Sequence, residues 1–265
     1  MNRAGLACVA RTGRGTEGLM IATTVLGELA LLGVLAATTG LGVAGWVAGT
    51  VHALVLAVLL ARGRRENGPA DRVTAVRAVL GGGVTALVAD GVAGLPVPVG
   101  ALVVLATVAL ALDAVDGRVA RRSGTASEFG ARFDMETDAW LIAVLSVHVA
   151  GLLGWWVVAI GAMRYAFVGI TAVVPWMRGT VPPTTGAKVV AAAQGIVLVV
   201  ASAPLLPATV DAAIVGIALV ALVWSFGRDV RYLSRAGSAA ARRRRSGGSR
   251  PAASGGSAPA GTRRR

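Results

Sequence analysis

Long apolar stretches separated by short polar or turn-forming segments fill most of the chain between residues 19 and 227. A helix needs about 20 predominantly apolar residues to cross the hydrocarbon core of a bilayer. Residues 19–61 carry a single formal charge, Glu28, and therefore have room for two such helices. With breaks placed at Gly and Pro clusters, the pattern predicts eight membrane-spanning helices: 19–39, 42–62, 74–94, 97–115, 135–153, 154–176, 187–205 and 209–227.

The basic residues predict how these helices are oriented. Every Lys and Arg except Arg164 falls in one of five polar segments: 1–18, 62–77, 116–134, 177–188 and 228–265. The turns near residues 95, 152 and 207 carry none. Cytoplasmic loops hold an excess of Lys and Arg, so we expect both termini and residues 116–134 on the cytoplasmic side. The preference for Arg over Lys and the richness in Ala, Gly and Val are typical of a GC-rich bacterial genome, which predicts a bacterial cell (inner) membrane.

Composition agrees with a membrane protein and sets the C-terminal end apart. Hydrophobic residues make up 55% of the chain and charged residues 15%, against about 25% charged residues in a typical soluble domain. Residues 236–265 are rich in Ser, Gly, Ala, Pro and Arg, cannot build a core, and are expected to be a disordered basic tail. A membrane protein with cytoplasmic loops already accounts for the net charge of +13, so a nucleic-acid partner is not expected. The tail is expected to be a solvated basic segment that helps to set the topology; attraction to anionic membrane lipid is the alternative.

Four aspartates lie at one boundary between apolar stretches. Asp113 and Asp116 are three residues apart, and Asp134 and Asp138 are four apart, so each pair shares one face of a helix. Crowded carboxylates repel one another and are costly to desolvate. Two facing pairs could hold two divalent cations, Mg²⁺ or Mn²⁺, which would cancel about four negative charges. The alternative is a set of ion pairs with nearby arginines: Arg118, Arg121, Arg122 and Arg132.

These aspartates belong to a longer pattern that resembles the signature of the CDP-alcohol phosphatidyltransferase family. Residues 113–138 read D-x2-D-G-x2-A-R-x8-G-x3-D-x3-D, and all eight fixed positions keep the family's spacing. The resemblance implies an all-α integral membrane protein with a six-helix core over residues 69–235. The helices at 19–62 would then be an extra N-terminal hairpin, preceded by a cytoplasmic segment at 1–18.

The resemblance also implies roles for individual residues. Metal ligands would be Asp113, Asp116, Asp134 and Asp138. Asp138 would also be the catalytic base. The CDP-binding positions would be Gly117, Ala120, Arg121 and Gly130, with Ser127 contacting the nucleotide.

Two further segments are similar to patterns in the family. Asp71, Thr74 and Arg77 match an N-x2-T-x2-R lead-in to the first core helix, with Asp71 in place of Asn. Residues 187–194 are similar to the G-K-x-K-T-x2-Q pattern of members that use a glycerophosphate. Lys188 and Gln194 are kept, whereas Val190 and Ala191 replace the second Lys and the Thr. Arg164 lies inside a predicted span, where a charged residue suggests a function. We therefore expect Arg164 and Lys188 to bind a phosphate on the acceptor; alternatively, Arg164 is structural and Lys188 extends its side chain to the membrane surface.

The predicted function is an integral membrane phosphotransferase of phospholipid biosynthesis. It would move a phosphatidyl group from a CDP-lipid, most simply CDP-diacylglycerol, to an alcohol acceptor and release CMP. The resemblance also implies a homodimer. Two alternatives stay open: a membrane transporter, and a catalytically inactive family member that acts as a scaffold.

Other ionisable residues also lie within the predicted spans. Glu28 and His52 fall at similar depth in the N-terminal hairpin. They are expected either to pair with each other or to be satisfied locally. Asp90 is expected to be structural.

Overall fold

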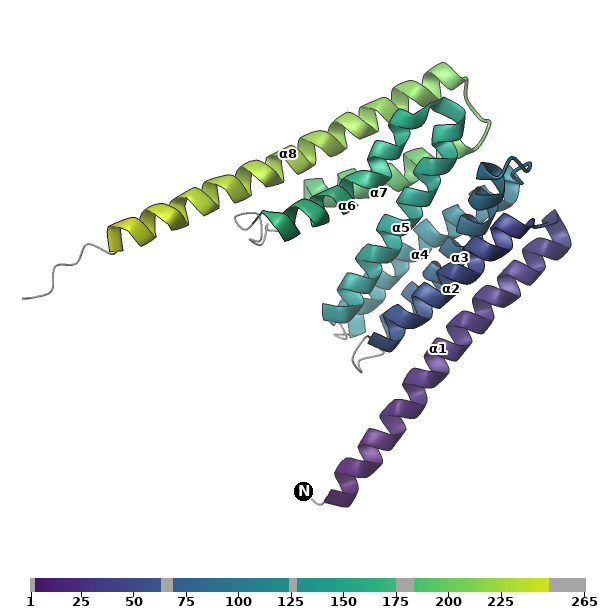
Figure 1. Ribbon diagram of the computed structural model, residues 1–265, viewed down its shortest axis with the longest axis horizontal. Coiled ribbons are helices and arrows are strands. Elements are labelled where there is room, and N and C mark those ends of the chain that lie inside the picture. The colour runs from purple at the N-terminus through teal and green to yellow at the C-terminus, as the bar shows by residue number, and fades with distance from the viewer. Residues whose placement is uncertain (1–2, 63–68, 124–127, 175–183, 248–265) are drawn as a thin grey trace, which may run out of the picture.

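The computed structural model describes residues 3–62, 69–123, 128–174 and 184–247, and side chains over 18–62, 72–113, 129–174, 184 and 186–235. Regular structure in these ranges is helical (Figure 1). The elements in chain order are α1 (Arg3–Thr39), α2 (Val43–Arg62), α3 (Pro69–Val92), α4 (Val99–Ser123), α5 (Glu128–Leu153), the 3₁₀ turn η1 (Trp155–Val157), α6 (Val158–Val173), α7 (Thr185–Ser202) and α8 (Ala208–Gly247). Each of the eight predicted helices is present, so the prediction of an all-α fold is confirmed.

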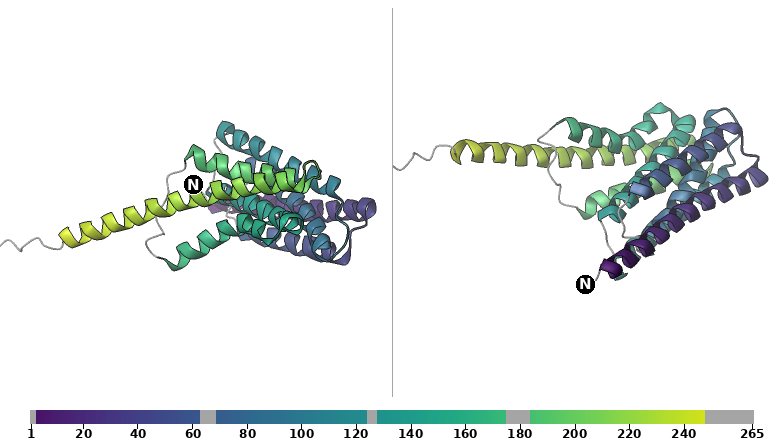
Figure 2. Two further views of the ribbon diagram at one scale, coloured as in Figure 1. Left: turned by 90° about the horizontal axis from the view of Figure 1, so that it is seen from above. Right: turned by 60° about the horizontal axis from the view of Figure 1, so that its bottom comes forward.

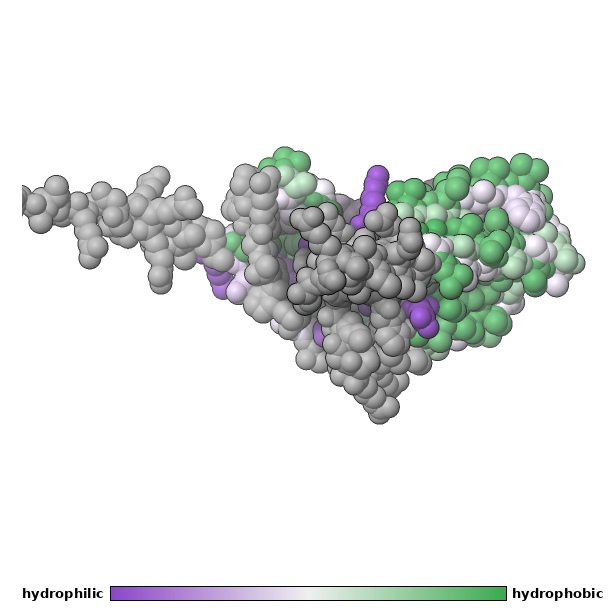
Figure 3. All heavy atoms as spheres, turned by 90° about the horizontal axis from the view of Figure 1, so that it is seen from below, coloured by the Kyte–Doolittle hydropathy of each residue, from purple (hydrophilic) through white to green (hydrophobic). Residues whose placement is uncertain are grey.

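Six helical segments are long and apolar enough to cross a membrane. They are Gly18–Thr39, Val43–Arg62, Arg72–Val92, Phe129–Leu153, Trp155–Val173 and Ala208–Arg235. Two more apolar segments, Val99–Asp113 and Gly186–Ser202, are shorter. Apolar side chains cover most of the coloured surface in Figure 3, as expected where lipid surrounds the protein. The chain is an integral membrane protein.

The last helix is longer than predicted. α8 continues to Gly247 and extends well beyond the other helices (Figure 2). Its end covers the first part of the segment 236–265 for which composition predicts disorder. Ala and Arg are among the strongest helix formers, and residues 239–245 consist only of these two types. Local propensity therefore continues the helix where no core is available to stabilise it; residues 248–265 lie outside the described ranges.

Helix α3 is the central element of the bundle. It packs against α1, α2, α4 and α5. Of its membrane-spanning stretch, 61% is buried inside the protein, against 17–33% for the other five spans. Gly82 and Gly83 allow this close packing, because a side-chain carbon at Gly82 would fall on the Glu28 carboxylate, and one at Gly83 would lie 2.9 Å from Leu31. The position of α3 matters for function because it begins beside the ends of α4 and α5 that carry the aspartates.

The N-terminal hairpin, α1 and α2, is attached to α3 by polar contacts as well as apolar ones. The Asp90 carboxylate accepts hydrogen bonds from the backbone N–H groups of Gly42 (2.7 Å) and Gly45 (2.6 Å), at the start of α2. These amides belong to the first turn of a helix, which has no internal acceptors for them. The structural role expected for Asp90 is confirmed.

Glu28 and His52 form a pair across the hairpin. Glu28 Oε1 lies 2.7 Å from His52 Nδ1, and the Glu28 side chain is fully buried. The pair lies against Gly82 of α3. Of the two arrangements expected from the sequence, direct pairing of Glu28 with His52 is confirmed.

Candidate metal centre

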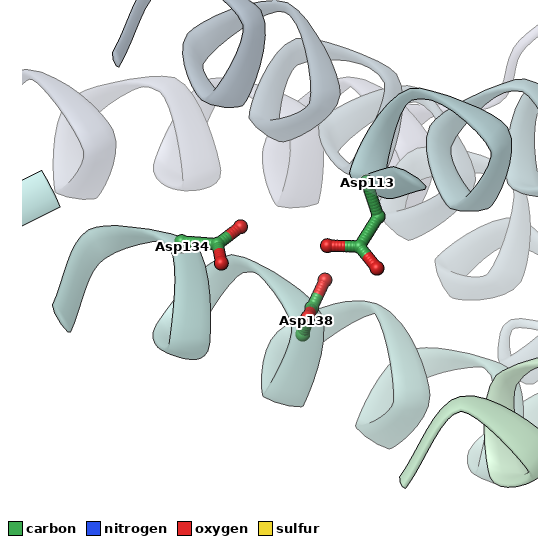
Figure 4. A group of neighbouring side chains, drawn as sticks. All are labelled: Asp113, Asp134 and Asp138. Carbon is green, nitrogen blue, oxygen red and sulfur yellow. The ribbon is translucent and has the colours of Figure 1, made fainter. Parts of the chain in front are cut away.

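Three of the four motif aspartates come together at the junction of α4 and α5. Asp113 lies on α4, and Asp134 and Asp138 lie one turn apart on α5 (Figure 4). One carboxylate oxygen from each lies within 4.8 Å of the other two. The i, i+4 spacing on α5 puts two carboxylates on the face that α4 approaches. Both α4 and α5 pack against α3, and this brings the third carboxylate, that of Asp113, to the same place.

Arg77 lies among these three carboxylates. Its Nη1 donates to Asp134, its Nη2 donates to Asp138, and Nη2 also lies 3.2 Å from Asp113 Oδ1. Arg77 comes from the third turn of α3, so three helices meet at this point. The planar guanidinium presents several N–H donors in a fixed fork and can contact several carboxylates at once.

Arg77 was not among the site residues expected from the sequence. The signal was present, because Arg77 is the last fixed position of the Asp71, Thr74, Arg77 pattern. That pattern gave no reason to place it beside residues that follow it by 36 or more positions. The ion-pair alternative named four other arginines, three of which (Arg118, Arg121 and Arg122) have side chains outside the described ranges, and Arg77 is a further arginine that contacts the carboxylates.

Burial differs between the cation and its partners. The Arg77 side chain is 1% exposed, whereas the three carboxylates are 36–41% exposed. Arg77 therefore lies beneath the cluster and the carboxylates face its open side. The three carboxylates are therefore reachable from that side, where a cation could approach them.

These residues fit a divalent cation. Mg²⁺ and Mn²⁺ prefer oxygen ligands, and carboxylates are their usual protein ligands. The three oxygens are close enough to share one ion, they are reachable, and the Arg77 guanidinium lies beneath them. Asp116 would belong to a second set of metal ligands. Its side chain lies outside the described ranges, although the backbone of α4 continues through it.

Most of the expected nucleotide-binding positions lie outside the described side chains. The α4 backbone continues to Ser123 and carries three of them: Gly117, Ala120 and Arg121. Ser127 lies in an undescribed segment. Gly130 is half-buried in the first turn of α5, one turn before Asp134.

Arg164 is not brought to the carboxylate cluster. Its Nη2 donates to Glu136 and its Nη1 lies 3.0 Å from the sulfur of Met135. Glu136 is two residues from both Asp134 and Asp138, about 200° round the helix from either. The ion pair therefore joins α6 to the other face of α5, which agrees with the structural alternative for Arg164.

Lys188 lies at the depth of the motif. It is exposed near the start of α7, where α7 runs antiparallel to α4. Gly195 of α7 packs on Leu110 of α4, since a side-chain carbon there would lie 2.8 Å from Leu110 Cδ2. Seven residues from this contact on each helix, Lys188 and Gly117 fall at the same level.

The comparison with known families agrees with this geometry. The model of the CDP-alcohol phosphatidyltransferase family matches residues 69–224, more than half of the 265 residues. This chain belongs to the CDP-alcohol phosphatidyltransferase family. The match begins at the first residue of α3 and includes all of the motif, so α1 and α2 lie outside it.

Two curated relatives are similar over a shorter stretch. They are "Probable phosphatidylglycerophosphate synthase" proteins of Mycobacterium tuberculosis, from strains CDC 1551 / Oshkosh and ATCC 25618 / H37Rv. Each is 33% identical to this chain over 127 residues, which is 47% of this chain and 60% of the relative. The aligned part of the chain thus spans less than two thirds of each relative. No solved structure matches the chain.

Proposed function

We propose that this protein transfers the phosphatidyl group of CDP-diacylglycerol to the hydroxyl of a phosphorylated alcohol and releases CMP. The observation that carries the proposal is the meeting of Asp113, Asp134 and Asp138 around Arg77 in a chain of this family. Glycerol 3-phosphate is the first acceptor to test, because the two curated relatives are described as phosphatidylglycerophosphate synthases. Inositol phosphate, serine and phosphatidylglycerol are the competing acceptors.

The proposed metal set is Asp113, Asp116, Asp134 and Asp138, which would hold two Mg²⁺ or Mn²⁺ ions. When bound, such ions neutralise a pyrophosphate and the charge that grows on its leaving phosphate. Arg77 positions the carboxylates of Asp134 and Asp138 for this role, because it donates to both.

In the proposed reaction, the acceptor hydroxyl oxygen forms a bond to the lipid-side phosphorus. The bond from that phosphorus to the bridging oxygen breaks, and CMP leaves with that oxygen. Asp138 accepts the proton of the attacking hydroxyl, which is the role of a general base. Its 36% exposure leaves the carboxylate open to an acceptor that arrives from water.

The remaining expected positions are proposed to hold the two substrates. Gly117, Ala120 and Gly130 lack bulk where the nucleotide approaches the backbone, and Arg121 and Ser127 would contact the donor. Lys188 is proposed to bind the acceptor phosphate. Its position at the same level as Gly117 supports this role. Arg164 is a poorer candidate, because Glu136 already neutralises it.

The distribution of basic residues supports a cytoplasmic site. We propose that both termini and the carboxylate cluster face the cytoplasm, in the inner membrane of a bacterium. A lipid donor would reach the cluster from the leaflet and a polar acceptor from the cytosol. A homodimer is proposed from the family resemblance.

The test is an assay with labelled CDP-diacylglycerol and a panel of alcohols in Mg²⁺ or Mn²⁺. We expect CMP release together with a new lipid product, with glycerol 3-phosphate the best acceptor. Chelation with EDTA should stop the reaction, and added Mg²⁺ or Mn²⁺ should restore it. If the folded protein releases no CMP with any of the alcohols, the scaffold alternative is favoured.

A further inference from the structure

An apolar groove of about 510 Å³ lies where the N-terminal hairpin meets the family core. One wall is α2, with Ala48, Val51, Val55 and Leu59. The other wall is formed by α3 and α5, and Tyr165 of α6 closes one side. The groove therefore needs α2, which lies outside the family match.

Several of the polar side chains that line the groove have partners within the protein. His52 is paired with Glu28, and Glu136 with Arg164. The Thr85 hydroxyl donates to the Gly81 carbonyl (2.7 Å) and accepts from Trp140 Nε1 (3.0 Å). Because these groups are satisfied, the groove gives an occupant mainly apolar contact and does not select for a polar molecule.

The dimensions of the groove match one leaflet of a bilayer. From Ala48 to Leu59, α2 rises about 16 Å, and half of the hydrocarbon core is about 15 Å. Leu59 lies near the end of α2 that is expected at the cytoplasmic surface. Val51 and Val55 are more than half exposed within a segment that can span the membrane, so lipid chains are the molecules that surround them.

The cytoplasmic end of the groove adjoins the carboxylate cluster. Phe133 and Thr137 line the groove and immediately precede Asp134 and Asp138 in α5. A lipid whose polar head is at the cluster would thus have a chain-sized apolar path on the neighbouring face of the same helix.

We infer that this groove holds one acyl chain of the CDP-diacylglycerol donor, and that the N-terminal hairpin serves to form its outer wall. This inference rests on the proposed function. Lipid tails are as apolar as the groove, so entering it yields little hydrophobic free energy. The groove therefore acts mainly by aligning the donor, and a poorly aligned donor reacts more slowly.

Groove-filling variants of the full chain test the inference. Val51→Trp places a large ring in the groove, and Ala48→Phe does the same one turn away. Leu54→Trp is the matched control, since Leu54 is 60% exposed on α2 and does not line the groove. Each variant is assayed with long-chain and short-chain CDP-diacylglycerol. We expect Val51→Trp and Ala48→Phe to lower kcat/KM for the long-chain donor by about tenfold and to leave the short-chain donor within about twofold. Leu54→Trp should change neither.

A second measurement uses the wild-type protein and does not require turnover. CDP-diacylglycerol with a photoreactive group on its acyl chain is cross-linked in lipid nanodiscs, and the labelled peptides are identified. Labelling of α2 and of the groove face of α5 supports the inference. Two results would overturn the inference and leave the proposed function intact. One is labelling confined to α4, α7 or α8. The other is equal activity of Val51→Trp and Leu54→Trp on both donors. Absence of transfer by the wild type would contradict the proposed function. Cross-linking alone would then test whether the groove binds an acyl chain.

Discussion

The carboxylate cluster and the Glu28–His52 pair both place charged or ionisable groups in an apolar helical bundle, but they are arranged differently. At the cluster, three carboxylates that are 36–41% exposed share one buried guanidinium. In the hairpin, one carboxylate that is 0% exposed faces one imidazole that is 11% exposed. The first arrangement has three converging carboxylates and an open side, whereas the second is closed and joins one carboxylate to one imidazole.

This difference separates a site from a structural contact. Buried ionisable groups persist only when they are paired or bind an ion, and in the hairpin His52 is the partner of one Glu28 oxygen. The other Glu28 oxygen is buried and has no hydrogen bond among the described residues. Three accessible carboxylates that converge from two helices, rather than acidic residues alone, mark the cluster as a place where a cation could bind.

The largest effect is expected from removing a charge from the cluster. Asp138→Asn should lower transfer by about 10³-fold or more, because it removes both a ligand and the proposed base. Initial rates of CMP release and a thermal unfolding curve measure activity and folding together. Asp211→Asn is the control, a buried acidic residue in the first turn of α8 that is remote from the motif in sequence. Equal activity of the two variants would contradict the assignment of the site.

A smaller loss is expected from Arg77→Lys. An ammonium keeps the charge but cannot present the planar fork that contacts three carboxylates, so we expect a fall in kcat of about 10-fold to 100-fold. The Mg²⁺ concentration needed for half-maximal rate should also shift, which a purely structural role would not produce. Arg72→Lys, an exposed residue on the same helix, should behave as wild type. An unchanged Mg²⁺ dependence in Arg77→Lys would argue against a positioning role.

The hairpin pair should affect stability more than rate. Glu28→Leu leaves His52 without its partner and should lower the free energy of unfolding by about 1–3 kcal/mol. In the double variant with His52→Leu, much of this loss should be recovered, because replacing both members of a buried pair by apolar groups is often neutral. Thermal or denaturant unfolding in detergent measures the cycle, and kcat with short-chain donor should stay within about threefold. A double variant as inactive as Asp138→Asn would place the pair in the catalytic machinery.

A stability effect of similar or smaller size concerns the packing of the hairpin on α3. A methyl group at Gly82 would collide with the Glu28 carboxylate, whereas one at Gly81 meets no atom within 4 Å. Gly82→Ala should therefore destabilise the protein by about 1–3 kcal/mol. Gly81→Ala should be neutral or stabilise it by up to about 1 kcal/mol, since Ala favours a helix over Gly. Equal unfolding temperatures for the two variants would show that the hairpin does not pack on α3 in this way.

Much of the site could be predicted from the sequence because its information is local. The spacing of Asp134 and Asp138 puts them on one helical face whatever the rest of the chain does. Spacing and the family pattern both suggested that Asp113 joins this site, but its proximity depends on how α4 and α5 each pack on α3. The contact of Arg77 with all three depends on α3 as well, and spacing along the chain cannot predict a meeting of three helices.

Other residues show where single-position reasoning is insufficient. Arg164 is a charge inside a predicted span, which suggested a substrate contact, yet tertiary packing gives it Glu136 as a partner. Gln194 matched a family position, and here its amide donates to the Ala218 carbonyl (2.9 Å) and joins α7 to α8. Both cases follow from the same physics, since a polar group in an apolar bundle is satisfied by whichever partner the fold brings near it.

The sequence by itself determined the number of helices, their approximate bounds and the faces on which the aspartates lie. These follow from apolar length, Gly and Pro breaks and the 3.6-residue turn, all of which act over a few residues. Only the tertiary structure decided which helices meet, and so placed Arg77 beneath the carboxylates, joined Glu28 to His52, and formed a groove between α2 and α5. The reason is that charge balance and cavity shape depend on distances between helices, which are set by the packing of the whole bundle.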